Sequence, residues 1–213
     1  MNIPLSPRLR ACCNFITPGH RVADVGTDHG YLGIWLLKQG ICPSVIASDI
    51  GEGPLSAAKT NAQRFGLTDK MQFCLSDGVQ NIPRDFDTLV IAGMGAQTMI
   101  HILENAAWLT DRTLVLQPQN KAHLLRAWLS KHGWHICREQ LVRDGRFLYA
   151  VMEVKYEPCE ALTPGQCWLS PALLACGHAE LPEYIRRTLS TLRKNALGDT
   201  ESLVSLKELE EQL

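Results

Sequence analysis

The chain has 213 residues, a formal net charge of −1 at pH 7 and eight scattered cysteines. This length can bury a sizeable core without disulfide support. The near-neutral charge neither supports nor excludes an RNA partner, which would have to bind a local basic patch. The first residues lack the apolar core of a signal peptide, no run is long enough to span a bilayer, and no cysteine pair has zinc or redox spacing. We therefore expect a cytoplasmic protein with reduced thiols, no membrane partner and no metal.

A short basic segment near the start predicts a lead-in helix. Prolines flank the residues from Ser6 to Arg10, and Leu9 and Cys12 follow at roughly helical spacing. Two roles stay open for this helix. It either caps one edge of a sheet or contacts RNA phosphates through Arg8 and Arg10.

The segment VADVGTDHGYLGIWLL, residues 22–37, predicts a strand, a glycine turn and a helix. In such a unit the turn brings backbone amides and the positive end of a helix toward a ligand, and glycine is needed where a side chain would keep the ligand away. We therefore expect a nucleotide-like cofactor at this turn. The candidate contacts are Asp24, Gly26, Thr27, Asp28 and Gly30.

Further strands and helices alternate along the next hundred residues. We expect strands at 44–50, 71–75, 88–92 and 113–116, with helices at 54–65, 97–107 and about 121–132. Because the carboxyl ends of parallel strands meet at one crevice, residues at these ends should also bind the cofactor, Asp49 at its ribose and Asp77 at its adenine amine. These candidates are Asp49, Ile50, Asp77, Gly78, Ala92, Gly93, Met94 and Gly95.

The end of the alternating pattern decides the fold class. Two strands at 135–142 and 147–154 flank an Asp-Gly turn, which predicts an antiparallel hairpin. A dehydrogenase would continue its βα alternation and would carry glycine at position 28, where this chain has Asp28. We therefore predict an α/β fold with the Rossmann-like, seven-stranded sheet of class I methyltransferases, whose last strand is antiparallel.

The composition changes after Lys155 to a segment rich in Pro, Gly and Cys. Two apolar stripes at helical spacing follow, one over 182–197 and one from Leu203 to Leu213, and they predict an antiparallel helical hairpin. We place a methyltransferase domain at 1–157, and a linker with an RNA-contacting hairpin at 158–213. The basic candidates on its first helix are Arg186, Arg187, Arg193 and Lys194.

The sequence resembles the bacterial tRNA methyltransferases that modify ring nitrogen 1 of adenine at tRNA position 22. The resemblance rests on SPRL, ADVGTDHGYL, ASDIGEGPL, SDG, VIAGMGA and LQPQN, in order across residues 6–120, and more weakly on WLSPALL at 168–174. Three positions depart from the family pattern: Gly33 replaces a proline, Ala96 replaces a second glycine, and Ser170 replaces the glycine before Pro171.

This resemblance implies methyl transfer from S-adenosylmethionine to tRNA. An adenine nitrogen attacks the donor methyl group, so the enzyme mainly aligns two reactants and needs neither a metal nor much acid–base machinery. The ring becomes cationic, and Asp28, or alternatively Asn120 or Gln117, would stabilise it near the exocyclic amine. His29 would line the site, and Tyr31 would stack on the target base.

Two other functions stay open. One is a methyltransferase of the same fold that acts on a small molecule or a protein, and the other is a non-catalytic module that binds cofactor or RNA. The Asn-Pro-Pro-Tyr sequence used on exocyclic amines is absent after the fourth strand, which favours a ring nitrogen as the target. We expect a monomer or a weak homodimer.

Overall fold

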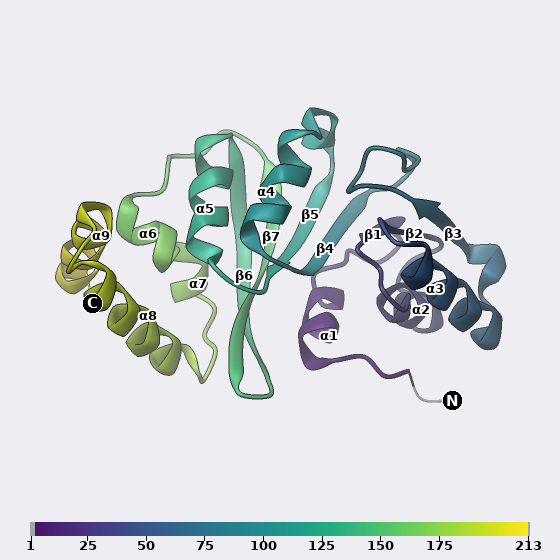
Figure 1. Cartoon of the computed structure of the whole chain (residues 1–213), viewed down its shortest axis with the longest axis horizontal. Coiled ribbons are helices and arrows are strands. Elements are labelled where there is room, and N and C mark those ends of the chain that lie inside the picture. The colour runs from purple at the N-terminus through teal and green to yellow at the C-terminus, as the bar shows by residue number, and fades with distance from the viewer. Residues whose placement is uncertain (1–2, 213) are drawn as a thin grey trace.

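A computed structural model describes residues 3–212 as a seven-stranded sheet with helices on both faces (Figure 1). The strand order is β3-β2-β1-β4-β5-β7-β6; β1 to β5 run parallel, and β7 is antiparallel to both β5 and β6. This confirms the predicted class. The strands are β1 (Val22–Val25), β2 (Val45–Asp49), β3 (Met71–Leu75), β4 (Thr88–Met94), β5 (Thr113–Pro118), β6 (Trp134–Asp144) and β7 (Phe147–Tyr156).

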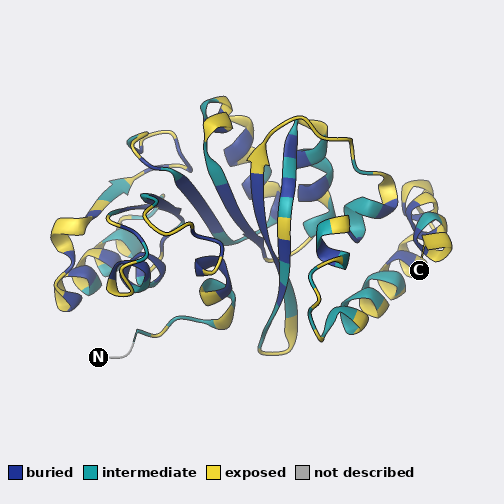
Figure 2. Ribbon diagram, turned by 180° about the vertical axis from the view of Figure 1, so that it is seen from behind, coloured by how far each residue is buried: buried dark blue, intermediate teal, exposed yellow. Residues whose placement is uncertain are grey.

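The helices divide between the two faces of the sheet. Helices α1 to α3 share one apolar cluster with Val22, Val90 and Val151, whereas α4, α5 and the C-terminal helices share the other. The central strands are buried along most of their length (Figure 2). The helices are α1 (Pro7–Cys13), α2 (Tyr31–Lys38), α3 (Glu52–Phe65), α4 (Ala96–Glu104), α5 (Ala122–Lys131), α6 (Pro164–Trp168), α7 (Pro171–Leu174), α8 (Leu181–Asn195) and α9 (Thr200–Gln212).

The lead-in helix α1 covers the middle of a face. Ser6 is its N-cap and Pro7 its first residue, which suits the fixed φ of proline. The helix contacts β4, β5, β7 and β6 as well as α2. Ala11, Cys12 and Cys13 are buried in this packing. Because β6 is an edge strand, the contacts of α1 reach one edge of the sheet, and the interpretation of α1 as a cap over that edge stays a prediction.

The C-terminal hairpin of the sheet is longer than the sequence indicated. The two strands pair from Trp134 with Tyr156 to Asp144 with Phe147, and only Gly145 and Arg146 form the turn. Gly145 has φ +59°, which glycine adopts at little cost. The tip of this hairpin lies near α1, since the Nε atom of Arg8 is 3.6 Å from Oδ2 of Asp144.

Two short helices, α6 and α7, occupy the segment expected to be a linker. A capping box of Thr163 and Gln166 begins α6, and Ser170 caps α7 by accepting from the Leu173 amide at 3.1 Å. Residues Leu169, Leu173 and Leu192 are fully buried in the same cluster as α4 and α5, so the core continues across the proposed boundary at 157/158. That boundary stays a prediction.

The two helices predicted at the C-terminus are present as α8 and α9. Helix α9 packs against α6 as well as α8, and the Gly165 amide donates to a carboxylate oxygen of Glu208 at 2.9 Å. Arg193 of α8 pairs with Glu210 of α9 at 2.8 Å. Leu213, the last residue of the predicted stripe, lies outside the described residues.

Two departures from the family pattern have packing explanations. The hydroxyl of Ser170 donates to the buried Glu139 carboxylate, a bond that glycine could not make. Gly33 allows α2 to approach β2, because a Cβ there would lie 2.8 Å from Cγ1 of Val45. Ala96 begins α4 and is fully buried.

Candidate active site

A cavity of about 270 Å³ lies where the carboxyl ends of β1 and β4 meet α1 and the start of α2. It joins the first glycine turn to the ends of β4 and β5, whereas the ends of β2 and β3, which the sequence predicted at the same crevice, do not line it. Its lining residues are Arg8, Leu9, Asp24, Gly26, Thr27, Asp28, His29, Tyr31, Leu32, Ala92, Gly93 and Gln119.

The glycine turn is held firmly against β2. The amides of Gly26 and Thr27 both donate to the Ser48 carbonyl oxygen at 2.9 Å, so these two amides already have protein partners. Gly26 has φ +77°, and a Cβ there would lie 2.3 Å from Cε of Met94. Gly30 has φ +72° and lies against Ala58 of α3. These glycines therefore let the turn pack closely against Met94 and α3, in backbone conformations that glycine adopts at little cost.

Asp24 places a buried carboxyl group in the cavity wall. Its side chain accepts a hydrogen bond from the Thr27 hydroxyl at 2.7 Å, and only 4% of the residue is exposed. Burial raises the pKa of Asp24 to about 6, although the Thr27 hydrogen bond acts in the opposite direction. A cationic group in the cavity would therefore be a favourable partner for this carboxylate.

Asp28, His29 and Tyr31 form the exposed rim of the cavity. Asp28 has φ +50°, a left-handed conformation that Asp tolerates better than most residues. Its Oδ1 is 3.6 Å from Nε2 of His29, and the rings of His29 and Tyr31 lie 5.7 Å apart between centroids. The structure thus brings three of the four predicted catalytic residues together. Their roles stay predictions.

The other predicted catalytic residue, Asn120, lies beside the cavity. Its Oδ1 is 3.4 Å from the position that a Cβ on Gly95 would occupy, and its side chain is exposed. The neighbouring Gln119 lines the cavity instead, because its amide donates to the Met94 carbonyl at 2.8 Å and fixes the chain there. The sequence motif contained Gln119 but did not indicate which residue faces inward.

The amide oxygen of Gln117 has its hydrogen-bond partners within the protein. Its Oε1 accepts from Nη1 of Arg8 at 3.1 Å and from the Gly93 amide at 3.2 Å, and its Nε2 donates to the Pro118 carbonyl at 3.0 Å. This buried side chain therefore positions Arg8 and Gly93 and is not free to hold an adenine amine. Gln117 and Arg8 are 109 residues apart, so no local signal could place Arg8 in the crevice.

Asp49, Ile50 and Asp77, at the ends of β2 and β3, are not among the residues that line the cavity. Asp49 accepts from the Gly51 amide at 2.9 Å, and the next residue, Ile50, is 72% exposed despite its apolar side chain. Asp77 is exposed too. Gly78 has a packing role, since a Cβ there would lie 2.9 Å from Cγ1 of Ile102. Cofactor binding at these residues stays a prediction.

Comparison with known proteins identifies the family. A methyltransferase domain matches residues 5–152. The tRNA (adenine(22)-N(1))-methyltransferase of Bacillus subtilis strain 168 is 32% identical over 153 residues, 70% of this chain and 64% of that protein. MG248 of Mycoplasma genitalium, provisionally named a tRNA methyltransferase, is 34% identical over 196 residues, 88% of each chain. The chain belongs to the methyltransferase family that this domain defines.

A solved structure supports the fold of this family member over almost its whole length. Streptococcus pneumoniae Sp1610, provisionally assigned as a tRNA (m1A22) methyltransferase and crystallised with S-adenosyl-L-methionine, has a TM-score of 0.87. The alignment covers 97% of this chain and 98% of that chain at 28% identity. The C-terminal helices are therefore part of the shared structure.

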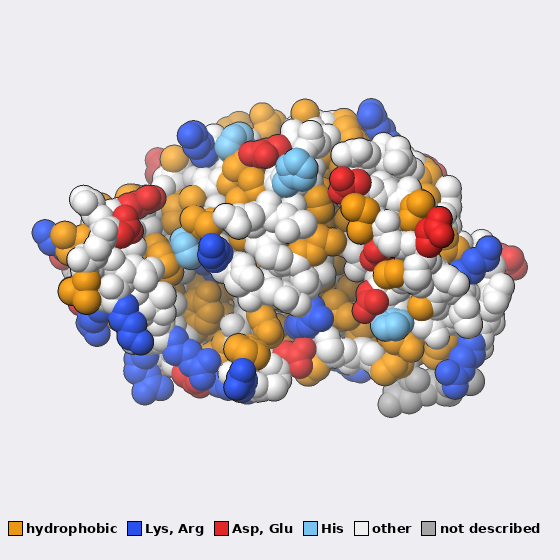
Figure 3. Space-filling view, in the orientation of Figure 1, with side chains coloured by type: hydrophobic (Ala, Val, Ile, Leu, Met, Phe, Trp, Pro, Cys, Tyr) orange, Lys and Arg blue, Asp and Glu red, His pale blue; other side chains and the backbone are white. Residues whose placement is uncertain are grey.

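Two of the four basic residues of α8 that were predicted to contact RNA form ion pairs with acidic side chains. Lys and Arg side chains gather over α8, at the lower left of Figure 3. Arg193 is paired with Glu210, and Arg187 with Glu183 at 2.5 Å. Arg187 also lines a groove of about 560 Å³ between α5 and α8, together with Lys121, which follows Asn120 directly. RNA contact by Arg186, Arg187, Arg193 and Lys194 stays a prediction.

Residues 3–212 contain a cluster of possible metal ligands and no membrane-spanning helix. No helix within residues 3–212 has the length and apolar character needed to cross a membrane. His135, Cys137 and Glu157 do bring possible metal-ligand atoms within 4.8 Å of one another at the β6 edge. The sequence spacing did not indicate this cluster, and the expectation that the protein needs no metal stays a prediction.

Proposed function

We propose that this protein transfers a methyl group from S-adenosylmethionine to ring nitrogen 1 of adenine at tRNA position 22. The observation that carries the proposal is the cavity in which the buried Asp24 and the Gly26 turn face a rim of Asp28, His29 and Tyr31. Family membership supports the same reaction. We place the protein in the cytoplasm, with tRNA as its macromolecular partner.

The residues of the crevice fit S-adenosylmethionine. The absence of a side chain at Gly93 lets Arg8 reach the cavity wall, since a Cβ on Gly93 would lie 2.7 Å from Nη1 of Arg8. The buried Asp24 suits the cationic amino group of the donor, Asp49 suits its ribose, and the exposed Ile50 offers an apolar surface for its adenine. When bound, the donor supplies a methyl group on a positively charged sulfur atom.

The rim residues would bind and orient the target adenine. Tyr31 offers a partly exposed ring on which the base can stack, beside His29. The Asp28 carboxylate would accept from the exocyclic amine and stabilise the positive charge that the ring gains on methylation. Together they align the base and exclude water, which is the main requirement of an in-line displacement.

One experiment tests the proposal directly. The protein is incubated with labelled S-adenosylmethionine and unmodified tRNA transcripts, and the methylated nucleoside is mapped. We expect 1-methyladenosine at position 22. Methylation at another position, transfer only to a metabolite or protein fraction, or cofactor binding without any transfer to RNA would each overturn it.

Asp49→Ala should weaken cofactor binding. The variant removes the carboxylate that we assign to the ribose hydroxyls and also its bond to the Gly51 amide. We expect the dissociation constant for S-adenosylmethionine, measured by calorimetry, to rise about tenfold or more, as for loss of a charged hydrogen bond. An unchanged constant would remove Asp49 from the cofactor site.

Asp28→Asn should lower turnover more than cofactor affinity. Asn tolerates the left-handed backbone at φ +50°, so the substitution removes the charge without straining the turn as Ala would. We expect kcat on tRNA to fall about 100-fold, as for loss of one electrostatic group at a reacting centre. Asp28→Ala serves as the comparison, and wild-type turnover in both variants would show that Asp28 has no part in catalysis.

A further inference from the structure

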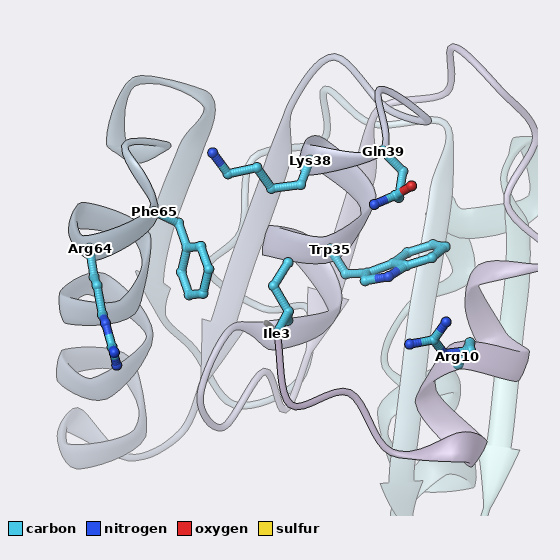
Figure 4. Close-up of a pocket in the computed structure, with 7 residues that line it drawn as sticks. All are labelled: Ile3, Arg10, Trp35, Lys38, Gln39, Arg64 and Phe65. Carbon is cyan, nitrogen blue, oxygen red and sulfur yellow. The ribbon is translucent and has the colours of Figure 1, made fainter. Parts of the chain in front are cut away.

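A second cavity, of about 480 Å³, lies on the face formed by α1, α2 and α3, away from the crevice. Its side chains come from the N-terminal segment, α1, α2 and the end of α3, with the Trp35 indole on the side nearest Arg10 and with Arg64 and Phe65 on α3 (Figure 4). Three of its 7 residues are basic and none is acidic. They are Ile3, Arg10, Trp35, Lys38, Gln39, Arg64 and Phe65. We call this set the α2 surface.

The three cations of the α2 surface have no acidic partner among the described residues. Arg10, Lys38 and Arg64 are exposed, and none forms an ion pair with an acidic side chain among residues 3–212. The basic helix α8 differs, because acidic residues pair with Arg187 and Arg193. In a chain with a net charge of −1, the α2 surface is thus a local concentration of unpaired positive charge.

An aromatic side chain, Trp35, lies beside Arg10 of the α2 surface. The guanidinium carbon of Arg10 is 5.7 Å from the centre of the Trp35 ring, and Trp35 is partly exposed. Figure 4 shows the indole between Arg10 and Lys38, with Phe65 on the neighbouring helix. Cations around an exposed aromatic ring are typical of surfaces that track a nucleic-acid backbone and stack a base.

Helices α1 and α2 connect the α2 surface to the rim of the active site. Tyr31, Trp35 and Gln39 are spaced by four residues, so they lie along one side of α2. Tyr31 lines the crevice, whereas Trp35 and Gln39 line the second cavity. Helix α1 makes the same connection, with Arg8 in the crevice and Arg10 over Trp35. At 1.5 Å per residue, Tyr31 and Lys38 are about 10 Å apart along the axis, a distance of roughly two nucleotides.

We propose that the α2 surface binds a ribose-phosphate segment of the substrate tRNA, with a base stacked on Trp35. This inference rests on the proposed function. RNA is favoured over an acidic protein because the partly exposed Trp35 indole beside Arg10 gives a base a stacking partner, whereas an acidic peptide would use the cations alone. The bound tRNA would then contact the protein both at the target base and along α2, as far as Lys38.

The test measures tRNA binding against salt concentration for three variants of the full chain. Lys38→Gln/Arg64→Gln should weaken binding and lower the slope of log K against log salt by about one to two, because two phosphate contacts are lost. Trp35→Leu should weaken binding about tenfold with an unchanged slope, because stacking carries no counterion release. Lys131→Gln, an exposed lysine at the end of α5, is the matched control and should behave as wild type.

Two further measurements separate this inference from the proposed function. Calorimetry with S-adenosylmethionine should give wild-type affinity for all three variants, since none of these residues lines the crevice. Wild-type tRNA affinity and slope in the double variant would overturn the inference even if the wild-type enzyme methylates position 22. Saturable binding of adenosine monophosphate or inorganic phosphate that the double variant abolishes, with tRNA binding unchanged, would also overturn it. Absence of methylation by the wild-type enzyme would overturn the proposed function alone.

Discussion

Arg126→Met should lower the free energy of unfolding by about 3–5 kcal/mol, as for breaking other buried ion pairs. The Arg126 side chain is 1% exposed and its partner, the Glu139 carboxylate, is 0% exposed. The guanidinium donates to Oε1 of Glu139 at 3.0 Å and to the Trp168 carbonyl at 3.0 Å. Methionine fills much of the space but leaves the Glu139 charge buried with only the Ser170 hydroxyl as a side-chain partner.

The control is a variant in which both charges are removed. Arg126→Met/Glu139→Leu should recover much of the lost stability in urea denaturation, because no uncompensated charge stays in the core. Cofactor affinity should be the same in both variants, since neither residue lines the crevice. A single variant as stable as wild type would mean that this pair does not hold α6 and α7 against α5 and β6.

The strand pattern could be predicted from the sequence because each strand is a short apolar run ended by turn residues. Residues 71–75 match β3 at both ends, and 88–92 lies within the longer β4. The Asp-Gly turn located the β6–β7 hairpin, which in turn defined the fold class. These are local signals of burial and turn geometry, which need no knowledge of distant partners.

Features that depend on distant partners could not be predicted. The helices α6 and α7 are too short for an apolar periodicity to stand out in the sequence. Caps stabilise both, Arg126 donates to carbonyls of α6, and the α7 cap Ser170 donates to Glu139. Helix α1 was predicted correctly, but its place on the sheet face depends on packing with four strands. The same limit applies to Arg8, whose place in the crevice is fixed by Gln117.

The candidate site shows the same division between local and distant signals. Asp28, His29 and Tyr31 are close in the chain and share one turn, so their proximity was predictable from the motif alone. Which residue after β5 faces the cavity depends on the bond between Gln119 and Met94, a contact between two strand ends. The sequence therefore points to the segment after β5, but to Asn120 in place of its neighbour Gln119, which lines the cavity.

Asp24→Asn should raise the stability of the protein at neutral pH and lower its affinity for the cofactor. The pKa of Asp24 is raised to about 6 in the folded protein, against about 3.9 for an ordinary Asp in the unfolded chain. The unfolded chain therefore releases this proton at lower pH, and the wild type loses stability relative to the Asn variant as pH rises from about 4 to 6. Above pH 7 the cost is about 3 kcal/mol, from two pKa units, and below pH 4 it disappears.

The apo Asn variant should thus be more stable than wild type at pH 7.5 and equal to it near pH 4, because Asn can still accept from the Thr27 hydroxyl. Its affinity for S-adenosylmethionine should nevertheless fall at least tenfold at pH 7.5, because the cationic amino group loses its buried carboxylate. Wild-type affinity should decrease as pH falls below 6, while that of the variant stays flat. A variant that is less stable than wild type at pH 7.5 would show that the buried Asp24 carboxylate stabilises the protein without cofactor. Asp24 would then not be an uncompensated charge that a bound cation stabilises.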